Sequence, residues 1–249
     1  MTQIILRTEN LTKQFHGFAA VQDVSLAIRT GGVHALIGPN GAGKTTLFNL
    51  LTNFIRPTSG RIIFEGADIT GKRPDIIARQ GVSRSFQISA VFPQMTVLEN
   101  LSIALQRKSG LSFKFWTHAR CLNHLQAKAR ELADSFSLLE YGDIAAGQLS
   151  YGRKRALEIA TTLAQEPRLV LLDEPMAGLA QEEIPSVTNI IGNVAKHTTV
   201  IMVEHNLGVV AEVSSFITVL NRGRILAEGT YDEISSNSAV KEAYLGSPD

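Results

Sequence analysis

The chain has 249 residues, of which 44% are hydrophobic and 19% charged, and its formal net charge is +1. Such a chain can bury a substantial core, as one domain or as a domain with an inserted lobe. Its basic residues are spread along the sequence, which gives no sign of a nucleic-acid surface, and no apolar run approaches the ~20 residues of a membrane-spanning helix. We expect no signal peptide, and the single cysteine, Cys121, excludes an internal disulfide.

The first part of the chain is expected to form a β-rich lobe around a glycine-rich loop. Residues 4–11, 24–28 and 61–64 carry the apolar and β-branched residues that are typical of strands.

The glycine-rich loop directly follows a short apolar run that ends at Ile37 and directly precedes a helix-compatible segment. This order is the architecture of a nucleoside triphosphate site. Glycines let successive amides surround the phosphates, and the helix N-terminus faces the same anion. The lysine adds charge at the β- and γ-phosphates, and the next hydroxyl is placed to bind magnesium. An ordinary turn with an exposed lysine is the alternative. The predicted loop residues are Gly38, Pro39, Asn40, Gly41, Ala42, Gly43, Lys44, Thr45 and Thr46.

Residues 88–150 are expected to form an inserted helical lobe. Apolar residues recur at helical spacing over residues 96–105 and 122–136. The aromatic and basic residues 113–116 between them suit a loop that faces a membrane or a partner, or a loop packed between helices.

A second helix N-terminus that could hold phosphate is predicted at Ser150. Serine is a favoured N-cap, and the following residues suit an amphipathic helix that runs to Pro167. From these residues alone, an ordinary capped helix with a basic first turn is the better interpretation.

An apolar run at residues 169–172 ends in two carboxylates, Asp173 and Glu174. Such a run suits a parallel strand covered on both faces, and ligands collect where parallel strands end. Asp173 is expected to hold magnesium through water, and Glu174 to polarise the water that attacks the γ-phosphate. The alternative is a buried strand whose acidic end only meets solvent.

Strand and helix signals alternate through the rest of the chain. Residues 200–203 form another apolar strand, and residues 224–229 form a final strand bounded by turns. Alternation of this kind indicates an α/β sheet.

This order of motifs closely resembles the ATP-binding cassette (ABC) family, whose signature Leu-Ser-Gly-Gly-Gln corresponds to residues 149–153. The resemblance implies an α/β fold: a P-loop NTPase cassette with a RecA-like core, an N-terminal antiparallel β lobe and an inserted helical subdomain, as one ABC ATPase domain over residues 1–249. It also implies that Ser150 and Gly152 bind the γ-phosphate of ATP held by a partner subunit. Tyr151 and Arg153 replace a glycine and the glutamine of the signature.

The resemblance assigns three further residues. Gln87 looks like the glutamine that links the ATP site to the membrane partner and contacts magnesium. His205 resembles the switch histidine at the γ-phosphate, and Phe15 the aromatic residue that stacks on adenine. Taken alone, a histidine after a strand is more often structural, and Phe15 also suits a strand or core position. Ala180 stands where many members carry an aspartate between the two ATP sites, so altered crosstalk with retained hydrolysis is expected.

Over nearly its whole length the chain looks like the ATPase subunits of bacterial importers for branched-chain amino acids or related small polar solutes. The narrower resemblance implies ATP and Mg²⁺ as cofactors, transmembrane permease subunits and a second ATPase subunit (the same or a related chain) as partners, and a solute-binding protein as an indirect partner. It also implies a peripheral location at the cytoplasmic face of the cell membrane. The residues that carry it are Tyr151 and residues 11–15, 38–52, 57–60, 83–87 and 243–246.

Three alternatives stay open. An exporter ATPase would have the same cassette, because the cassette does not encode direction. A degenerate regulatory cassette with weak hydrolysis is motivated by Arg153 and Ala180. A soluble ABC protein acting on nucleic acid is disfavoured because only one phosphate loop is present.

Overall fold

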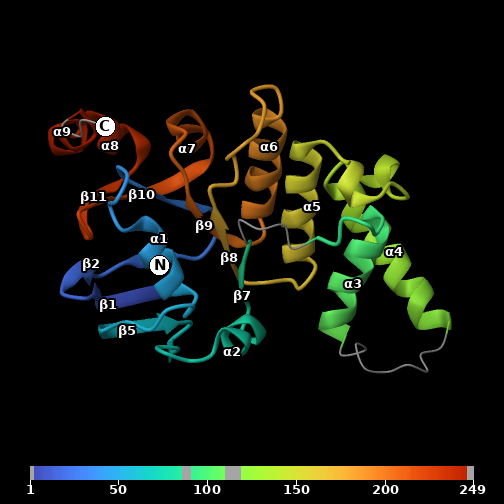
Figure 1. The fold of residues 1–249 in the computed structure, drawn as a ribbon, viewed down its shortest axis with the longest axis horizontal. Helices are drawn as coiled ribbons and strands as arrows, with labels where there is room; N and C mark the ends of the chain where they lie inside the picture. The colour runs from blue at the N-terminus through green and yellow to red at the C-terminus, as the bar shows by residue number, and fades with distance from the viewer. Residues whose placement is uncertain (1–2, 86–90, 110–118, 246–249) are drawn as a thin grey trace. The chain divides into compact units, whose positions relative to one another are not determined.

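The computed structural model describes residues 3–85, 91–109 and 119–245 (Figure 1). The chain divides into two compact units. The first consists of Met1–Arg84, Arg168–Pro175 and Ile191–Asp249, and the second of Ser85–Pro167 and Met176–Ile190. Within the described residues, no helix is both long enough and apolar enough to cross a bilayer.

The first unit contains a six-stranded sheet in the order β11-β10-β4-β9-β8-β7. All neighbouring strands in it are parallel except β10 and β11, which form an antiparallel edge. Every residue of β4, β8 and β9 is buried, as expected for parallel strands with both faces covered. The strands are β4 (Val33–Ile37), β7 (Val82–Arg84), β8 (Leu169–Asp173), β9 (Thr199–Val203), β10 (Ser214–Asn221) and β11 (Arg224–Gly229).

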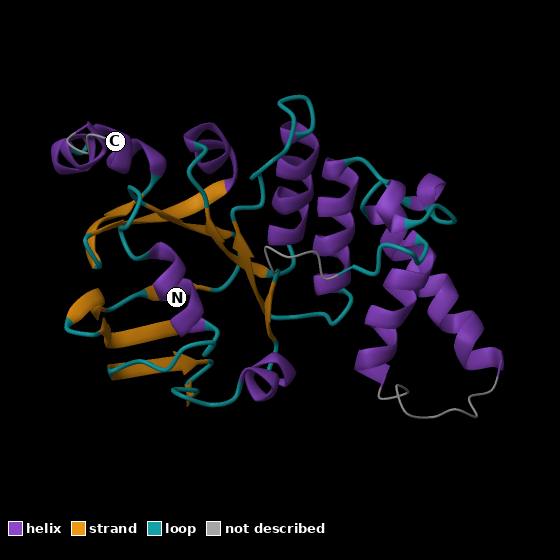
Figure 2. Cartoon of the chain, in the orientation of Figure 1, coloured by secondary structure: helices purple, strands orange, loops and turns teal. Residues whose placement is uncertain are grey.

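An antiparallel sheet at the start of the chain belongs to the same unit. Figure 2 shows helix α1 between this sheet and the parallel one. Residues of α1 such as Phe48 share a buried core with Leu6 and Ile62 of the antiparallel strands and with Leu171 of β8. The strands are β1 (Ile4–Phe15), β2 (Phe18–Val24), β3 (Ala27–Arg29), β5 (Ser59–Phe64) and β6 (Ala67–Asp68), and the helices of the first unit are α1 (Lys44–Leu51), α2 (Pro74–Arg79), α7 (Leu207–Val213), α8 (Tyr231–Ser236) and α9 (Ser238–Leu245).

The strand predicted over residues 24–28 is interrupted in the structure. The hydroxyl of Thr8 donates to the carbonyl of Val24 and accepts a hydrogen bond from the amide of Leu26. The amide of Thr8 also donates to the carbonyl of Leu26, so this buried residue bonds through both backbone and side chain to the break where β2 ends at Val24 and β3 begins at Ala27. The strand predicted over residues 4–11 is longer than expected and continues to Phe15.

The second unit is helical. Helices α3 and α4 pack against each other (Figure 1), and both contact α5. Thr96 and Glu99 form a reciprocal capping box at the start of α3, because each side chain accepts from the other residue's amide. The aromatic residues 113–116 lie outside the described residues. The helices are α3 (Val97–Ser109), α4 (Ala119–Ser135) and α5 (Tyr151–Leu163), with short 3-10 turns at Leu139–Tyr141 and Ala146–Gln148, and α6 (Ile184–Ala195) begins in this unit and ends in the first.

Candidate functional site

The glycine-rich loop connects the end of β4 to the start of α1, as its sequence suggests. Gly43, the N-cap of α1, has φ +99°, and a Cβ there would lie 2.4 Å from the carbonyl oxygen of Ala20. Gly41 also has a left-handed φ, of +75°, although the space around it is open. No side chain caps α1 at Gly43, and no acidic residue lies in its first turn. The N-terminal amides of α1 therefore meet no competing carboxylate from their own helix.

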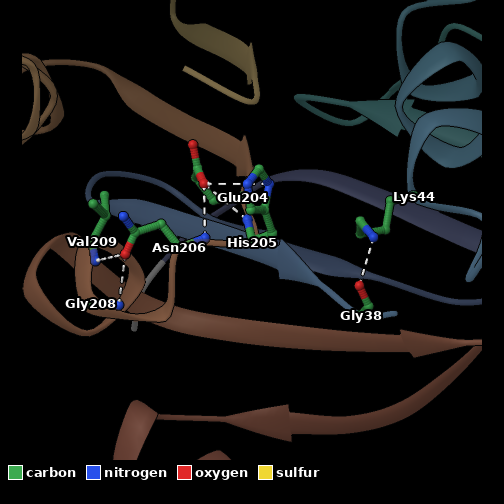
Figure 3. Close-up of polar contacts among 7 residues, drawn as sticks. All are labelled: Gly38, Lys44, Glu204, His205, Asn206, Gly208 and Val209. Carbon is green, nitrogen blue, oxygen red and sulfur yellow. Dashed lines mark hydrogen bonds and ion pairs between the residues drawn. The ribbon is translucent and has the colours of Figure 1, made fainter. Parts of the chain in front are cut away.

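Lys44 is folded back across this loop. Its ammonium group donates to the carbonyl oxygens of Gly38 at 2.6 Å and Pro39 at 3.0 Å, the first of which is drawn in Figure 3. Burial lowers the pKa of Lys44, and the Glu174 carboxylate opposes this effect to a smaller extent. Lys44 therefore places a positive charge at the phosphate loop and within electrostatic range of Glu174. Of the loop's other polar side chains, Asn40 and Thr45 are exposed, and Thr46 is half-buried.

The two predicted carboxylates lie at the end of β8, next to β9. Asp173 is the last residue of the strand, and it is buried against the guanidinium of Arg84 with an N–O distance of 2.7 Å. Glu174 has a left-handed φ of +45°, and its amide donates to the carbonyl of Val203 on β9. Left-handed backbone at a residue with a β-carbon is costly and concentrates at functional sites. The strand end therefore turns Glu174 out of the sheet while Asp173 stays within it.

His205 follows the end of β9 and has an exposed ring. The neighbouring Glu204 is buried, and its carboxylate accepts hydrogen bonds from the amides of His205 and Asn206 (Figure 3). Asn206 in turn caps α7 by accepting from the amides of Gly208 and Val209. These bonds fix the backbone of His205 while its ring reaches outward.

Phe15 is the last residue of β1, and its ring is 42% exposed, so it does not belong to the hydrophobic core. The ammonium group of Lys13 lies 5.0 Å from the centre of this ring. An exposed aromatic face beside a cation can stack on a planar ligand.

In the second unit, Ser150 is the N-cap of α5 and accepts from the amide of Arg153. The amide of Gly152 donates to the carboxylate of Glu183 at 3.0 Å, and a weaker bond from the amide of Ala180 reaches the same group at 3.4 Å. The Gly152 amide, followed by the Ser150 hydroxyl, lowers the pKa of Glu183. A carboxylate from the same chain therefore occupies the amide that the family resemblance assigns to a partner's phosphate.

The two departures from the family signature have local contacts. The Tyr151 ring lies over Gly178, where an added Cβ would come 3.2 Å from the ring. The guanidinium of Arg153 lies 4.0 Å from the centre of the Tyr141 ring, a cation–π distance. Both side chains thus pack within the second unit.

The structure brings several predicted residues of the first unit to one edge of the parallel sheet. The phosphate loop, the carboxylate pair and His205 follow β4, β8 and β9, which are neighbours in the sheet. Ser150 and Gly152 belong to the second unit. Gln87 lies outside the described residues.

Oxygen ligands suited to magnesium are present at this edge, in the carboxylate of Asp173 and the hydroxyl of Thr45. Among the described residues, no group of three or more histidine, cysteine or acidic side chains could hold a metal alone. Magnesium is commonly bound by one or two protein oxygens together with substrate phosphates.

Sequence reasoning missed several residues that the structure places at these sites. In the sequence, Arg84 is distinguished only by its place in the segment that contains Gln87, whereas in the structure it pairs with Asp173. Glu183 carried no local signal. Tyr244 on α9 hydrogen-bonds with the backbone of Gly38; burial raises the pKa of this tyrosine, and the bond to Gly38 lowers it to a smaller extent.

Comparisons with known proteins agree with this geometry. The family described as "ABC transporter" matches residues 21–177, and a C-terminal family described as "Branched-chain amino acid ATP-binding cassette transporter" matches residues 224–249. The chain is similar to the high-affinity branched-chain amino acid transport ATP-binding protein BraF of Pseudomonas aeruginosa, with 40% identity over 253 residues and 99% of each chain covered. LivG of Escherichia coli K12 has the same description and is 39% identical with the same coverage.

Solved structures show the same fold. The ADP conformation of MJ1267, an ATP-binding cassette of an ABC transporter, aligns with a TM-score of 0.85 and 33% identity over 99% of this chain and 100% of that one. A nucleotide-free ATP-binding cassette from an ABC transporter aligns with a TM-score of 0.84 over 98% of this chain and 100% of that one. These matches confirm the predicted α/β cassette fold. Since a family match over more than half of the chain accompanies full-length identity of this size, the chain belongs to the ABC transporter family, as an ATP-binding and ATP-hydrolysing subunit.

Proposed function

We propose that this ATPase powers the import of branched-chain amino acids or a related small polar solute. The names of its full-length relatives and the C-terminal family match at residues 224–249 support this substrate class. The observation that carries the catalytic part is the convergence of the phosphate loop, the carboxylate pair and His205 on neighbouring strand ends of one sheet.

Each residue at this edge has a proposed role. Residues 38–46 surround the phosphates with backbone amides, and Lys44 supplies charge to the β- and γ-phosphates. Glu174 is the general base for the attacking water, and His205 contacts the γ-phosphate. Phe15 stacks on adenine with its exposed ring.

Thr45 and Asp173, with Gln87, are the proposed magnesium ligands. When bound, magnesium neutralises charge on the β- and γ-phosphates. Asp173 is suited to this position because it is a buried carboxylate at the end of β8, with Oδ2 held by Arg84. Thr45 is suited because it directly follows the phosphate-loop lysine, in the first turn of α1.

The second part of the proposal concerns a partner cassette. Ser150 and Gly152 bind the γ-phosphate of ATP held by that partner, through a capped helix N-terminus with its dipole. In the single chain, the Glu183 carboxylate already accepts from the Gly152 amide. A γ-phosphate needs the same donor, so closure of the dimer displaces Glu183.

The remaining partners follow from transport. The cassette is a single ABC ATPase domain whose helical lobe, at about residues 88–150, together with Gln87 meets the transmembrane permease subunits. A second ATPase subunit, identical or related, completes the dimer, and a solute-binding protein acts indirectly through the permeases. The working location is the cytoplasmic face of the cell membrane, as a peripheral subunit.

Phosphate release from the purified transporter complex tests this function. We expect magnesium-dependent ATP hydrolysis that rises when leucine-loaded solute-binding protein is added. An ATP hydrolysis rate that is unchanged by the binding protein but rises with solute on the cytoplasmic side would support an exporter instead. Tight ATP binding without phosphate release in the complete complex would support a degenerate regulatory cassette.

A further inference from the structure

Arg84 is the last residue of β7 and forms a buried bridge between two parts of the ATP site. One guanidinium nitrogen donates to Oδ2 of Asp173 at 2.7 Å, and the other donates to Oδ1 of Asn49 at 2.5 Å. Asp173 ends β8, whereas Asn49 lies on α1, the helix that starts at the phosphate loop. One side chain thus ties the metal-binding strand end to the phosphate-binding helix.

The surroundings of Arg84 fix the orientation of its planar guanidinium group. Its side chain is 11% exposed, and its charge lies 5.0 Å from the centre of the Phe48 ring and 5.5 Å from that of Phe54. A planar fork can donate to two acceptors in fixed directions while its faces lie against aromatic rings. The ammonium group of a lysine is a compact point charge without that fixed fork.

The Nε atom of Arg84 is buried, and no hydrogen-bond partner for it is found among the described residues. The hydrogen bonds by which this guanidinium joins separate elements are those to Asp173 and Asn49.

We infer that Arg84 is a positioning residue for the magnesium-binding carboxylate. Its bond to Oδ2 fixes the rotamer of Asp173, the carboxylate that would hold magnesium. Its bond to Asn49 fixes the distance of that carboxylate from the phosphate-loop helix. This inference rests on the proposed magnesium role of Asp173 and Thr45.

The test measures how strongly magnesium tightens nucleotide binding. The dissociation constant of the full chain for a fluorescent ATP analogue is measured with EDTA and again with excess Mg²⁺. The value in EDTA divided by the value in Mg²⁺ reports the coupling between metal and nucleotide, and a larger ratio means stronger coupling. The variants are Arg84→Lys, which keeps the charge, and Arg84→Gln, which removes it. Arg79→Lys, at an exposed arginine on α2, is the matched control, and Thr45→Ala is the reference for loss of a metal ligand.

Positioning by geometry predicts that Arg84→Lys and Arg84→Gln both lower this ratio by about tenfold, while affinity in EDTA changes by less than about twofold. Arg79→Lys leaves both affinities unchanged. Far-UV circular dichroism and Tm establish that each variant is folded, and a purely structural role would lower Tm without changing the ratio.

Three results would overturn the inference. An unchanged ratio in Arg84→Lys, with a reduced one in Thr45→Ala, would show that the charge alone is sufficient. An increased ratio in Arg84→Gln would show that Arg84 competes with magnesium for Asp173. A wild-type ratio in Thr45→Ala would show instead that the proposed metal site itself is wrong, which separates that failure from a failure of Arg84.

Discussion

The phosphate loop offers a matched pair of glycine substitutions, Gly43→Ala and Gly41→Ala. Both positions have left-handed φ values, +99° and +75° respectively. A Cβ at Gly43 would lie 2.4 Å from the Ala20 carbonyl oxygen, which is backbone and cannot rotate away, whereas a Cβ at Gly41 would meet nothing within 4 Å. Both variants therefore carry the cost of a left-handed backbone at alanine, but only Gly43→Ala adds a steric clash with the Ala20 carbonyl oxygen.

The magnitudes follow from these geometries. Left-handed backbone costs an alanine about 1 to 2 kcal/mol, and the reduced entropy of the unfolded chain offsets about 0.4 to 1 kcal/mol of this. Gly41→Ala should therefore destabilise the protein by about 0 to 1.6 kcal/mol. Overpacking adds about 1 to 3 kcal/mol at Gly43. Since 1 kcal/mol corresponds to about 2 to 4 °C in a protein of this size, Gly43→Ala should melt several degrees below Gly41→Ala.

Differential scanning fluorimetry of the two variants without nucleotide checks the stability difference, and titration with a fluorescent ATP analogue checks the function. We expect both variants to bind ATP more weakly than the wild type, because both alter a loop that surrounds phosphate, and we expect Gly43→Ala to lose more affinity. Equal melting temperatures for the two variants would refute the packing argument. A lower melting temperature for Gly41→Ala would contradict the loop geometry directly.

Three other perturbations have defined outcomes. Glu174→Gln should keep ATP binding and slow hydrolysis by ~100-fold to ~10,000-fold, as for a lost general base, and near-normal phosphate release would refute its role. Burial lowers the pKa of His34 to about 4, so only the unfolded chain gains a proton at this residue as the pH falls from about 6.5 toward 4.5. In urea denaturation, the free energy of unfolding of the wild type should therefore fall by about 2 kcal/mol more between pH 7 and pH 4.5 than that of His34→Gln. Equal losses in the two proteins would contradict this. Glu183→Gln, added to the Glu174→Gln variant, should let an ATP-dependent dimer form at lower protein concentration in sedimentation velocity, because a charged competitor for the Gly152 amide is gone; weaker dimerisation would show that Glu183 supports the turn.

Local sequence patterns were sufficient to predict the parallel core. The apolar runs at residues 169–172 and 200–203 are buried strands, and the carboxylates that stop the first run lie at a strand end. Such patterns work because a strand covered on both faces must be apolar along its whole length. The glycine loop is equally local, since its conformation is encoded by adjacent residues.

Contacts between distant residues could not be predicted in this way. Arg84 and Asp173 are 89 residues apart in the sequence, and Gly152 and Glu183 are 31 apart. Neither Arg84 nor Glu183 differs in type from an ordinary surface charge, so only the fold shows that one is buried and the other caps a helix. The break between β2 and β3 has the same origin, because it depends on the hydroxyl of Thr8.

Uptake of labelled leucine into proteoliposomes tests the central claim most directly. The vesicles would contain this chain with its permease subunits and second ATPase subunit, with ATP and Mg²⁺ at the cassettes and solute-binding protein on the opposite side. We predict ATP-dependent leucine transport away from the binding-protein side, which is lost when this chain carries Glu174→Gln. Leucine movement in the reverse direction, or transport that persists unchanged in that variant, would contradict the account.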